Sequence, residues 1–376
     1  MHALIPLLAL LFSGPGSTVA VGPYLLAPAA GKVHVRWLVN TATCGQLNVE
    51  GETVSHQVQG KVLHPPLSKY KLLNTVCGAD LKHLAPCARY RYRLTAGGSE
   101  HGPFEFQAPP ETGASCPDGL RLLVYGDTRT NHLQHAAVVS HMKKAGAHLL
   151  LHIGDLLNHS NKPEEWYKFF EIEKQFLPTA PLVLTPGNHE GWPDFNMGFA
   201  AMTRFFRVKT KGGVGSWSFN YGLAHILVID LYMDGALYDD DIRWIEKHLA
   251  AVPEGRFKFV LLHEPPYSFG RHKPRAQVVK LREVFKKARV HAVFAGHSHH
   301  YEHFNVEGIH YLTVGGAGAP FHRPRQNVVP DQEKYFVKAA KVHHFLTVDL
   351  ESTRASCVVH DTDNNKVLDS WTIPLR

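Results

Sequence analysis

The stretch Gly296-His297-Ser298-His299 is the last of five short polar runs that together decide the fold expected for this chain. The four earlier runs also carry metal-binding or acid–base side chains: Gly126-Asp127-Thr128-Arg129, Gly154-Asp155, Gly187-Asn188-His189-Glu190 and Val260-Leu261-Leu262-His263. As candidate ligands or acid–base groups they supply two carboxylates, one amide oxygen and four imidazoles. Oxygen and imidazole donors suit zinc, manganese or iron. The sequence therefore predicts a metal site assembled from five loops.

Each polar run comes directly after a short apolar stretch. The stretches cover residues 120–125, 148–153, 182–184, 257–262 and 290–295. Apolar runs of this length bounded by Gly or Pro predict buried strands. Helical patterns lie between several of them, at about 132–145, 163–176, 239–250 and 275–288. Alternating strands and helices indicate βαβ units, whose strand C-termini open into loops at one edge of a sheet. We therefore expect an α/β fold in which the five runs converge.

The N-terminal part of the chain has a different pattern. Residues 21–108 lack helical periodicity and show strand-like runs at 32–39, 46–49, 70–76 and 89–94. This spacing fits a small β-sandwich resembling fibronectin type III. Proline, glycine and small polar residues at 109–118 predict a linker. The second domain then covers residues 119–376, with further strands expected at about 309–314, 343–350, 355–360 and 366–373.

Composition restricts the possible classes of protein. Hydrophobic residues make up 44% and charged residues 19% of the 376 residues, which is typical of a globular chain and not of a disordered one. The net charge of +7 suits an anionic substrate, although a mild excess is also typical of an ordinary solvated surface. No block of Lys and Arg interleaved with aromatic residues is present, so the sequence predicts no nucleic-acid-binding module.

Residues 1–20 have the pattern of a secretory signal. An apolar stretch from Leu4 to Phe12 is followed by small residues up to Ala20. We expect cleavage near Ala20 and export to the periplasm, the cell surface or the medium. The alternative is a disordered or buried N-terminus. No other segment approaches the length needed to span a membrane.

The chain contains five cysteines, so at least one thiol stays free in a monomer. No Cys-x-x-Cys pair is present, which argues against a thiolate zinc site. Export would permit disulfides. We expect Cys77–Cys87 and Cys116–Cys357, with five reduced and buried cysteines, Cys44 included, as the alternative.

The order of the runs Gly-Asn-His-Glu, Val-x-x-His and Gly-His-x-His resembles the calcineurin-like metallophosphoesterases, and within them the purple acid phosphatase branch. The resemblance extends from about Gly22 to Trp371. Branch features are Gly22-Pro23-Tyr24-Leu25, the glycine-rich run 315–320 and Tyr301-Glu302. The resemblance implies a two-layer metallophosphoesterase β-sandwich flanked by helices, preceded by a small all-β sandwich domain.

The resemblance also assigns two metal ions, of Fe, Zn or Mn, and their ligands. Asp155 would bridge the two ions, because a shared carboxylate holds them close enough to act together on one phosphate. Asp127 and His299 would complete the first metal site, and Asn188, His263 and His297 the second. A hydroxide between the metals would attack phosphorus. His189 would be the general acid and would contact the substrate.

Two positions depart from the family pattern. Purple members carry a tyrosine three residues after the bridging aspartate, where this chain has Asn158. Asn158 would offer the first metal a neutral carbonyl oxygen, so we expect no purple colour. Many other members carry Asp-x-His in the first run, where this chain has Arg129. Its guanidinium suits a phosphate oxygen of the substrate, and a structural ion pair is the alternative.

For the other polar and aromatic residues near the runs, the sequence predicts only general structural roles. Glu190 is expected to support its loop by a hydrogen bond, and His135 to cap a helix or lie in the core. The remaining ones are expected to form pocket wall or packing: His152, His159, Trp192, Tyr267, His300 and His303.

These residues predict an exported, metal-dependent phosphoric ester hydrolase acting on a phosphomonoester, in a small molecule or a phosphorylated macromolecule. A phosphodiesterase or nucleotide hydrolase is the alternative on the same site. A surface-binding protein with a dead catalytic domain is the alternative of another class. His189 and the full second ligand set are both present, which favours an enzyme. A domain that has lost its catalytic activity usually loses such residues first.

Overall fold

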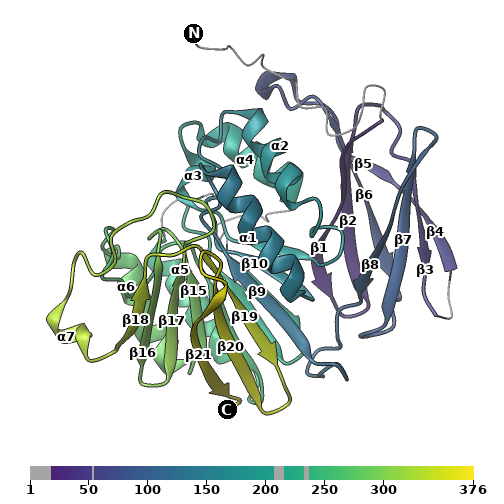
Figure 1. Cartoon of the computed structure of the whole chain (residues 1–376). Helices are drawn as coiled ribbons and strands as arrows, with labels where there is room; N and C mark the ends of the chain where they lie inside the picture. Colours follow the sequence, from purple (N-terminus) through teal and green to yellow (C-terminus); the bar gives the residue numbers. More distant parts are fainter. Residues whose placement is uncertain (1–17, 53–54, 207–215, 233–236) are drawn as a thin grey trace, which may run out of the picture.

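The computed structural model describes residues 18–52, 55–206, 216–232 and 237–376 (Figure 1). Most of the signal-like segment lies outside these residues, and strand β1 already begins at Val19. The N-terminal part forms a sandwich of strands from two sheets. One is a separate sheet ordered β4 (Ser55–Gln59), β3 (Gln46–Glu50), β7 (Arg89–Ala96) and β8 (Ser99–Gln107). The other is the end of a larger sheet that continues into the rest of the molecule.

That larger sheet has ten strands among the described residues. Its order is β21 (Lys366–Pro374), β20 (Arg354–Asp361), β19 (His344–Leu350), β9 (Leu120–Tyr125), β10 (Leu149–His152), β11 (Leu182–Leu184), β1 (Val19–Ala29), β2 (Lys32–Val39), β6 (Thr75–Lys82) and β5 (Lys61–His64). The central strands β9, β10 and β11 are parallel, and β1 joins them in parallel through Leu26 and Leu182. The N-terminal strands are therefore hydrogen-bonded to the sheet that carries part of the polar runs.

A second sheet of seven strands stacks against this one. Its order is β12 (Trp217–Tyr221), β13 (Ala224–Val228), β14 (Phe257–Leu261), β15 (Ala292–Ala295), β17 (Ile309–Val314), β16 (Tyr301–Val306) and β18 (Phe336–Ala340). Strands β13, β14, β15 and β17 are parallel, and the outer strands are antiparallel.

Helices cover the outer faces of both sheets (Figure 1). The longer ones are α1 (His132–Ala145), α2 (Pro163–Glu173), α4 (Phe195–Phe206), α5 (Asp239–Ala250) and α6 (Ala276–Lys287), and the short ones are α3 (Asn188–Gly191), α7 (Pro330–Glu333) and the 3-10 turn Ser68–Tyr70. Helices α1, α2 and α4 share a core with the ten-stranded sheet, and α5 and α6 share one with the seven-stranded sheet. The layers are therefore helix, sheet, sheet and helix.

Strand β9 shows how the sequence produces these layers. Leu122 and Val124 enter the core between the two sheets, whereas Leu123 and Tyr125 enter the core under the helices. Successive strand residues point to opposite faces, so a continuous apolar run is required where both faces are covered. Each such buried side chain contributes roughly 1.5–3 kcal/mol relative to leaving it exposed.

The predicted elements agree with this structure at most positions, and one strand was placed wrongly. The run 70–76 was expected to be a strand, but residues 68–70 form a 3-10 turn and β6 begins at Thr75. Lys71 takes a left-handed conformation with φ of 54° and ends the turn. The pattern of apolar residues does not indicate this turn, because the left-handed conformation of Lys71 is a local property of the backbone. Helix α4, with the buried Met202 and Phe205, was not predicted.

The expected disulfide pairing is wrong. The structure pairs Cys44 with Cys77 and Cys87 with Cys116, with Cα–Cα distances of 5.5 and 5.6 Å. Cys357 is a free, buried thiol on β20, so one thiol does stay free. Trp37 on β2 donates Nε1–H to the carbonyl of Cys44 at 2.8 Å, which holds that loop against the strand neighbouring Cys77. The spacing of cysteines along the sequence does not show that this loop and the strand of Cys77 lie together in the fold.

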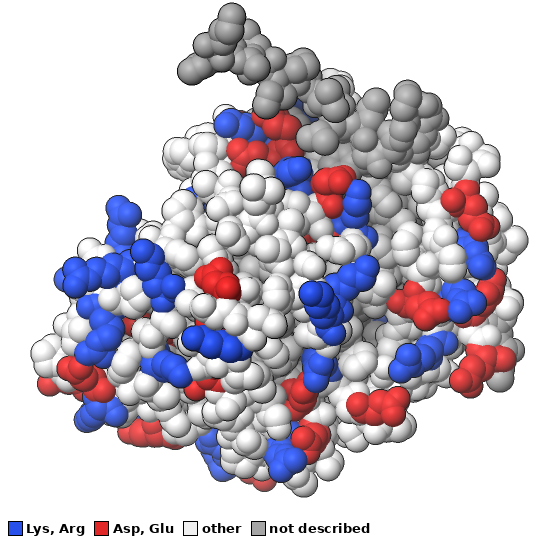
Figure 2. Space-filling model, in the orientation of Figure 1, with Lys and Arg blue, Asp and Glu red and all other residues white. Residues whose placement is uncertain are grey.

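The charged surface is mixed. On the face seen in Figure 2, blue Lys and Arg side chains are interspersed with red Asp and Glu. The net charge of +7 is thus not gathered into one basic patch on that face. Within the described ranges, no helix has the length and apolar character needed to cross a bilayer.

Candidate metal centre

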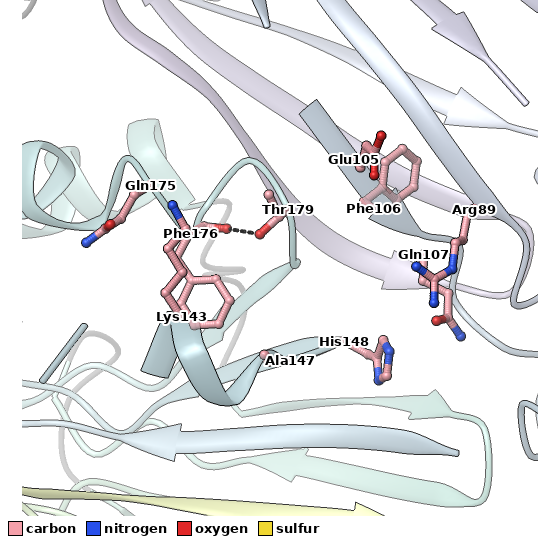
Figure 3. A pocket seen from close by; sticks show the side chains of 11 residues that line it. Arg89, Glu105, Phe106, Gln107, Lys143, Ala147, His148, Gln175, Phe176 and Thr179 are labelled. Carbon is pink, nitrogen blue, oxygen red and sulfur yellow. Dashed lines mark hydrogen bonds between the residues drawn. The ribbon is translucent and has the colours of Figure 1, made fainter. Parts of the chain in front are cut away.

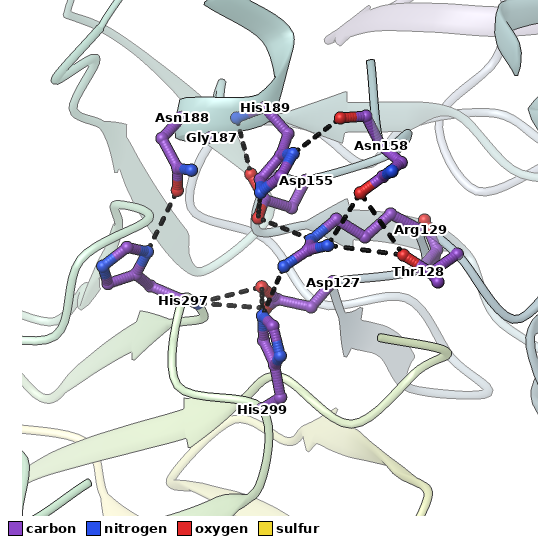
Figure 4. A network of polar contacts seen from close by, with 12 residues as sticks. Asp127, Thr128, Arg129, Asp155, Asn158, Gly187, Asn188, His189, His297 and His299 are labelled. Atoms are coloured by element: carbon purple, nitrogen blue, oxygen red, sulfur yellow. Dashed lines mark hydrogen bonds and ion pairs between the residues drawn. The ribbon is translucent and has the colours of Figure 1, made fainter. Parts of the chain in front are cut away.

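The five polar runs meet where parallel strands of the two sheets end. Asp127, Asp155 and the Asn188–His189 pair follow β9, β10 and β11 of one sheet. His263 and the run 297–299 follow β14 and β15 of the other sheet. Figure 4 shows the labelled side chains pointing toward one another from the two sides. The seven residues predicted as ligands are thus brought together: Asp127, Asp155, Asn158, Asn188, His263, His297 and His299.

The backbone at this edge is held in an uncommon conformation. Asp127, Asp155 and His297 have φ values of 55°, 57° and 66°, a region that non-glycine residues rarely adopt. Strain of this kind persists where the surrounding structure enforces it, often at functional sites. The flanking glycines allow the loops to approach: a Cβ on Gly296 would lie 2.3 Å from Asp127 Oδ2.

The second ligand set consists of imidazole nitrogens and amide and carboxylate oxygens that face one another. His263 donates Nδ1–H to the carbonyl of Ile153 at 2.7 Å, because a carbonyl can only accept. Its other ring nitrogen, Nε2, lies 3.2 Å from Asn188 Oδ1 and 3.4 Å from Asp155 Oδ1. His297 Nδ1 lies 3.0 Å from the same Asn188 oxygen. Imidazole nitrogens together with amide and carboxylate oxygens are the atoms that zinc, manganese or iron bind, so this set fits a metal ion.

The first ligand set has a different environment, because a guanidinium lies among its members. Arg129 Nε is 3.3 Å from Asp155 Oδ2, Nη1 is 2.9 Å from Asn158 Oδ1, and Nη2 is 3.3 Å from His299 Nε2 (Figure 4). Asp127 Oδ1 lies 3.5 Å from His299 Nε2. These acceptors already face a positive charge with hydrogen-bond donors. As arranged, the first set does not fit an additional cation.

Burial perturbs the acid–base groups of the centre. Burial and then the neighbouring Asp155 raise the pKa of Asp127 well above its usual value, against the opposing charge of Arg129. Burial lowers the pKa of His299 to about 2 and that of His297 well below its usual value. Both imidazoles are therefore neutral, which is the form that coordinates metals.

His189 is positioned by its ring and by its backbone. Its Nδ1 donates to the carbonyl of Asn158 at 2.7 Å, and its backbone N–H donates to Asp155 Oδ1 at 3.0 Å. The other ring nitrogen, Nε2, is 3.9 Å from Asp155 Oδ2 at the partly open side of the centre. Burial lowers the pKa of His189, so its protonated form requires acidic solution.

Glu190 joins the loop that carries Asp155 to the loop that carries Asn188. The sequence predicts that it supports its loop in this way. Its carboxylate accepts the backbone N–H groups of Asp155 at 2.9 Å, Leu156 at 2.8 Å and Gly187 at 2.6 Å. Burial and the charge of Asp155 raise the pKa of Glu190 to about 8, against the three N–H groups that favour its charged form.

Two histidines at the rim were missed by the sequence argument. The His322 ring stacks on His299 with centroids 3.9 Å apart, and the His272 ring lies 4.3 Å from that of His297. Both come from loops outside the five runs, and their rings are 5.0 Å apart. No local spacing signal could have found them, because only the folded loops bring them to the ligands.

The other flanking residues have structural contacts. His135 is buried and pairs with Glu173 at 2.8 Å, which confirms a core role. His152 contacts Thr128 Oγ1 at 3.2 Å, and Arg282 stacks over Tyr267 at 3.8 Å, away from the ligands. Trp192 is 52% exposed and packs its ring against His159 and His189.

A separate hollow lies far from this chemistry. It has a volume of about 350 Å³ and lies between the N-terminal sandwich and α1 (Figure 3). Its lining includes Arg89, Phe106, Lys143 and His148. None of the seven predicted ligands lines it, so its size does not make it the candidate active site.

Comparison with known proteins agrees with this geometry. Residues 120–301, which include all five polar runs, match the family model of the calcineurin-like phosphoesterases. The matched region covers 182 of the 376 residues and is similar to that family. The match agrees with the metal-dependent phosphoesterase that the ligand runs predicted.

The relatives and solved structures similar to this chain include purple acid phosphatases. A purple acid phosphatase of Glycine max is 27% identical over 69% of this chain and 60% of its own length. The Fe(3+)-Zn(2+) purple acid phosphatase 12 of Arabidopsis thaliana is 28% identical over 62% of this chain and 53% of its own length. The chain thus spans less than two thirds of both relatives.

Among solved structures, the purple acid phosphatase PPD1 of Lupinus luteus superposes with a TM-score of 0.78, covering 94% of this chain and 74% of that one at 18% identity. At this identity the likeness concerns the fold. The predicted fold class, a two-layer β-sandwich flanked by helices with an additional all-β sheet, is confirmed.

Proposed function

We propose that this chain is a metal-dependent phosphomonoesterase. The observation that carries the proposal is the convergence of His263 Nε2, Asn188 Oδ1 and Asp155 Oδ1, three atoms of the kind that bind metal ions, beside the ring of His189. The plant relatives named as purple acid phosphatases support the same reaction class.

The residues have separable roles in this proposal. Asn188, His263, His297 and Asp155 would hold a metal ion, which when bound supplies Lewis acidity toward phosphate oxygen and water. His189 donates a proton from Nε2 to the leaving oxygen, while its Nδ1–H bond to Asn158 keeps the ring in place. The lowered pKa of His189 makes this donor effective in acidic solution.

The rim residues are consistent with a phosphate monoester as substrate. Arg129 is 14% exposed, and its guanidinium is the positive charge nearest the open side of Asp155. His272 and His322 extend the same wall. Burial lowers the pKa of both imidazoles, that of His322 to about 4, so the fixed charge of the wall is that of Arg129. A dianionic monoester benefits from this charge more than a singly charged diester does. A phosphodiester or nucleotide remains the alternative substrate class.

The number of metal ions depends on whether each of the two ligand sets can hold one. The Arabidopsis relative is named for two ions, Fe(3+) and Zn(2+). Two ions in this chain, of Fe, Zn or Mn, would require Asp155, Asn158 and His299 to release the guanidinium of Arg129.

The decisive experiment measures release of p-nitrophenol from its phosphate monoester and from the bis-ester. We expect monoester turnover that disappears after exhaustive chelation and returns with Zn²⁺ or Mn²⁺. His263→Ala should remain inactive after metal is restored, while Glu173→Gln, which changes a buried carboxylate outside the centre, should respond like the wild type. Chelator-resistant turnover would contradict the proposal, and a folded, metal-loaded but inert protein would favour a binding role.

We also propose export and a two-domain division, with residues 1–20 as signal, 21–108 as a fibronectin type III-like unit, 109–118 as linker and 119–376 as the catalytic domain. Two disulfides support an oxidising compartment. N-terminal sequencing of protein from the culture medium should begin near residue 21. An intact Met1 would contradict the signal assignment.

A further inference from the structure

We propose that the guanidinium of Arg129 takes the place of the first metal ion, so that the centre binds one metal ion per chain, in the second ligand set. This inference deepens the proposed function and rests on it for the identity of the centre. It concerns how the predicted two-ion site is completed in this chain.

The tautomer of His299 gives the first argument. Its Nδ1 lies 2.7 Å from the carbonyl oxygen of Pro320, which can only accept, so Nδ1 carries the hydrogen. The lone pair is therefore on Nε2, and Arg129 Nη2 approaches that atom at 3.3 Å. A zinc ion would lie about 2.0–2.1 Å along the same lone pair. It would overlap Nη2, so ion and guanidinium exclude each other.

The remaining nitrogens of Arg129 contact two other expected ligands, Asp155 and Asn158. Nε contacts Asp155 Oδ2, which leaves Asp155 Oδ1 directed at His263 in the second set. Nη1 contacts Asn158 Oδ1 at 2.9 Å, at the position where purple members carry the phenolate. All three guanidinium nitrogens thus face atoms predicted to bind the first ion. A planar fork that matches its acceptors in this way is characteristic of arginine and is not reproduced by lysine.

The surrounding chain keeps Arg129 turned inward. Thr130 has φ of 75°, which is a rare conformation for a β-branched residue, and its hydroxyl lies 3.3 Å from Nη1. The Asn131 N–H donates to the Arg129 carbonyl at 3.0 Å and closes a tight turn. The side chain is 14% exposed and Asp155 only 1%, so the pair is largely shielded from water. In such surroundings a carboxylate needs a fixed counter-charge, and Arg129 supplies it.

With both carboxylates ionised, a one-ion centre would carry a small positive charge, which suits an anionic phosphate ester. Two buried carboxylates, Asp127 and Asp155, would face one divalent ion and one guanidinium. A guanidinium cannot polarise water as a metal does, but it can neutralise charge that develops on a phosphoryl oxygen. Arg129 would thus stabilise the reacting group from the side on which the first metal stands in two-metal centres.

Metal counting on the full chain tests this inference independently of activity. Apo-protein is loaded with excess Mn²⁺, freed of unbound ion by gel filtration and analysed by mass spectrometry of the metal and by electron paramagnetic resonance. We expect one Mn²⁺ per wild-type chain with the spectrum of an isolated ion. Arg129→His removes the guanidinium and adds an imidazole, so it should bind two Mn²⁺ with the spectrum of an exchange-coupled pair.

Arg271→Ala is the matched control, because it removes an exposed arginine near His272 without touching the ligands. It should bind one ion, like the wild type. Two ions in the wild type, or one ion in both the wild type and Arg129→His, would overturn the inference. If the counts are as expected but no phosphate ester is cleaved, the proposed function fails while the one-ion centre stands.

Discussion

Glu190 Oε2 accepts the backbone N–H of Asp155 at 2.9 Å, across a gap of 35 residues in the sequence. The same carboxylate binds Leu156 and Gly187, so it ties the loop after β10 to the loop after β11. Asp155 is held at φ 57° by this clamp. A buried side chain that contacts none of the candidate ligand atoms therefore determines where Asp155 points.

We predict that Glu190→Gln destabilises the fold and weakens metal binding. The amide NH₂ would face a backbone N–H and leave a buried donor unsatisfied, which costs about 1–3 kcal/mol. Loss of such support typically weakens metal affinity ~10–100-fold. Denaturant unfolding and Zn²⁺ titration measure the two effects. Glu173→Gln should lower stability without changing Zn²⁺ affinity, and equal affinity in both variants would contradict the clamp.

His189→Ala should reduce turnover according to the leaving group. General acid catalysis contributes ~10²–10⁴-fold when the leaving oxygen needs a proton. An alkyl phosphate should lose about that factor, while p-nitrophenyl phosphate, whose leaving group is stable without a proton, should lose much less. Kinetics on both esters, with metal content measured in parallel, check this. A uniform loss on both would indicate that His189 only positions the substrate.

Protein produced in iron-containing medium should lack the visible absorption of a tyrosinate–ferric pair, because Asn158 stands where the phenolate would be. Its amide oxygen lies 2.9 Å from Arg129 Nη1, so the wild type offers neither a phenolate nor an open first site. The double variant Arg129→Ala/Asn158→Tyr removes the guanidinium and adds the phenol, so it should gain the band. Absorption spectra of both iron-grown proteins test this, and a purple wild type would be the contrary result.

Stability should fall as the pH falls from about 6.5 toward 4, in part because of His291. Burial lowers the pKa of His291 to about 4, and its Nδ1 accepts the backbone N–H of Lys258 at 3.0 Å. Unfolded histidine binds a proton near pH ~6.5. Between these values the unfolded state binds more protons, so acidification favours unfolding by up to about 1.4 kcal/mol per pH unit for this group.

The variant His291→Asn tests this dependence, because its amide oxygen can accept the same N–H but does not titrate. Urea unfolding of chelator-treated protein at several pH values should give a shallower slope for the variant. The exposed His83→Asn should leave the slope unchanged. Identical slopes for wild type and His291→Asn would show that His291 does not contribute.

The amino-acid sequence by itself determined the local elements and the identity of the ligand-type residues. Continuous apolar runs such as 120–125 and 257–262 require strands buried on both faces, and the polar residues after them must then lie at strand ends. Both patterns, the apolar run and the polar residues after it, depend only on residues that are close together in the sequence. For the same reason helix α1 was predicted with its observed limits, 132–145.

Only the tertiary structure decided which distant atoms meet. The pairing of Cys44 with Cys77, the contact of β1 with β11 and the stacking of His322 on His299 each join segments whose separation carries no pattern. Arg129 shows the reason most directly. Its sequence position allowed a phosphate contact or an ion pair, and the choice depends on the lone pair of His299, which in turn depends on the Pro320 carbonyl. Side-chain direction and tautomer are properties of packed surroundings, so they arise only when the two sheets close on one another.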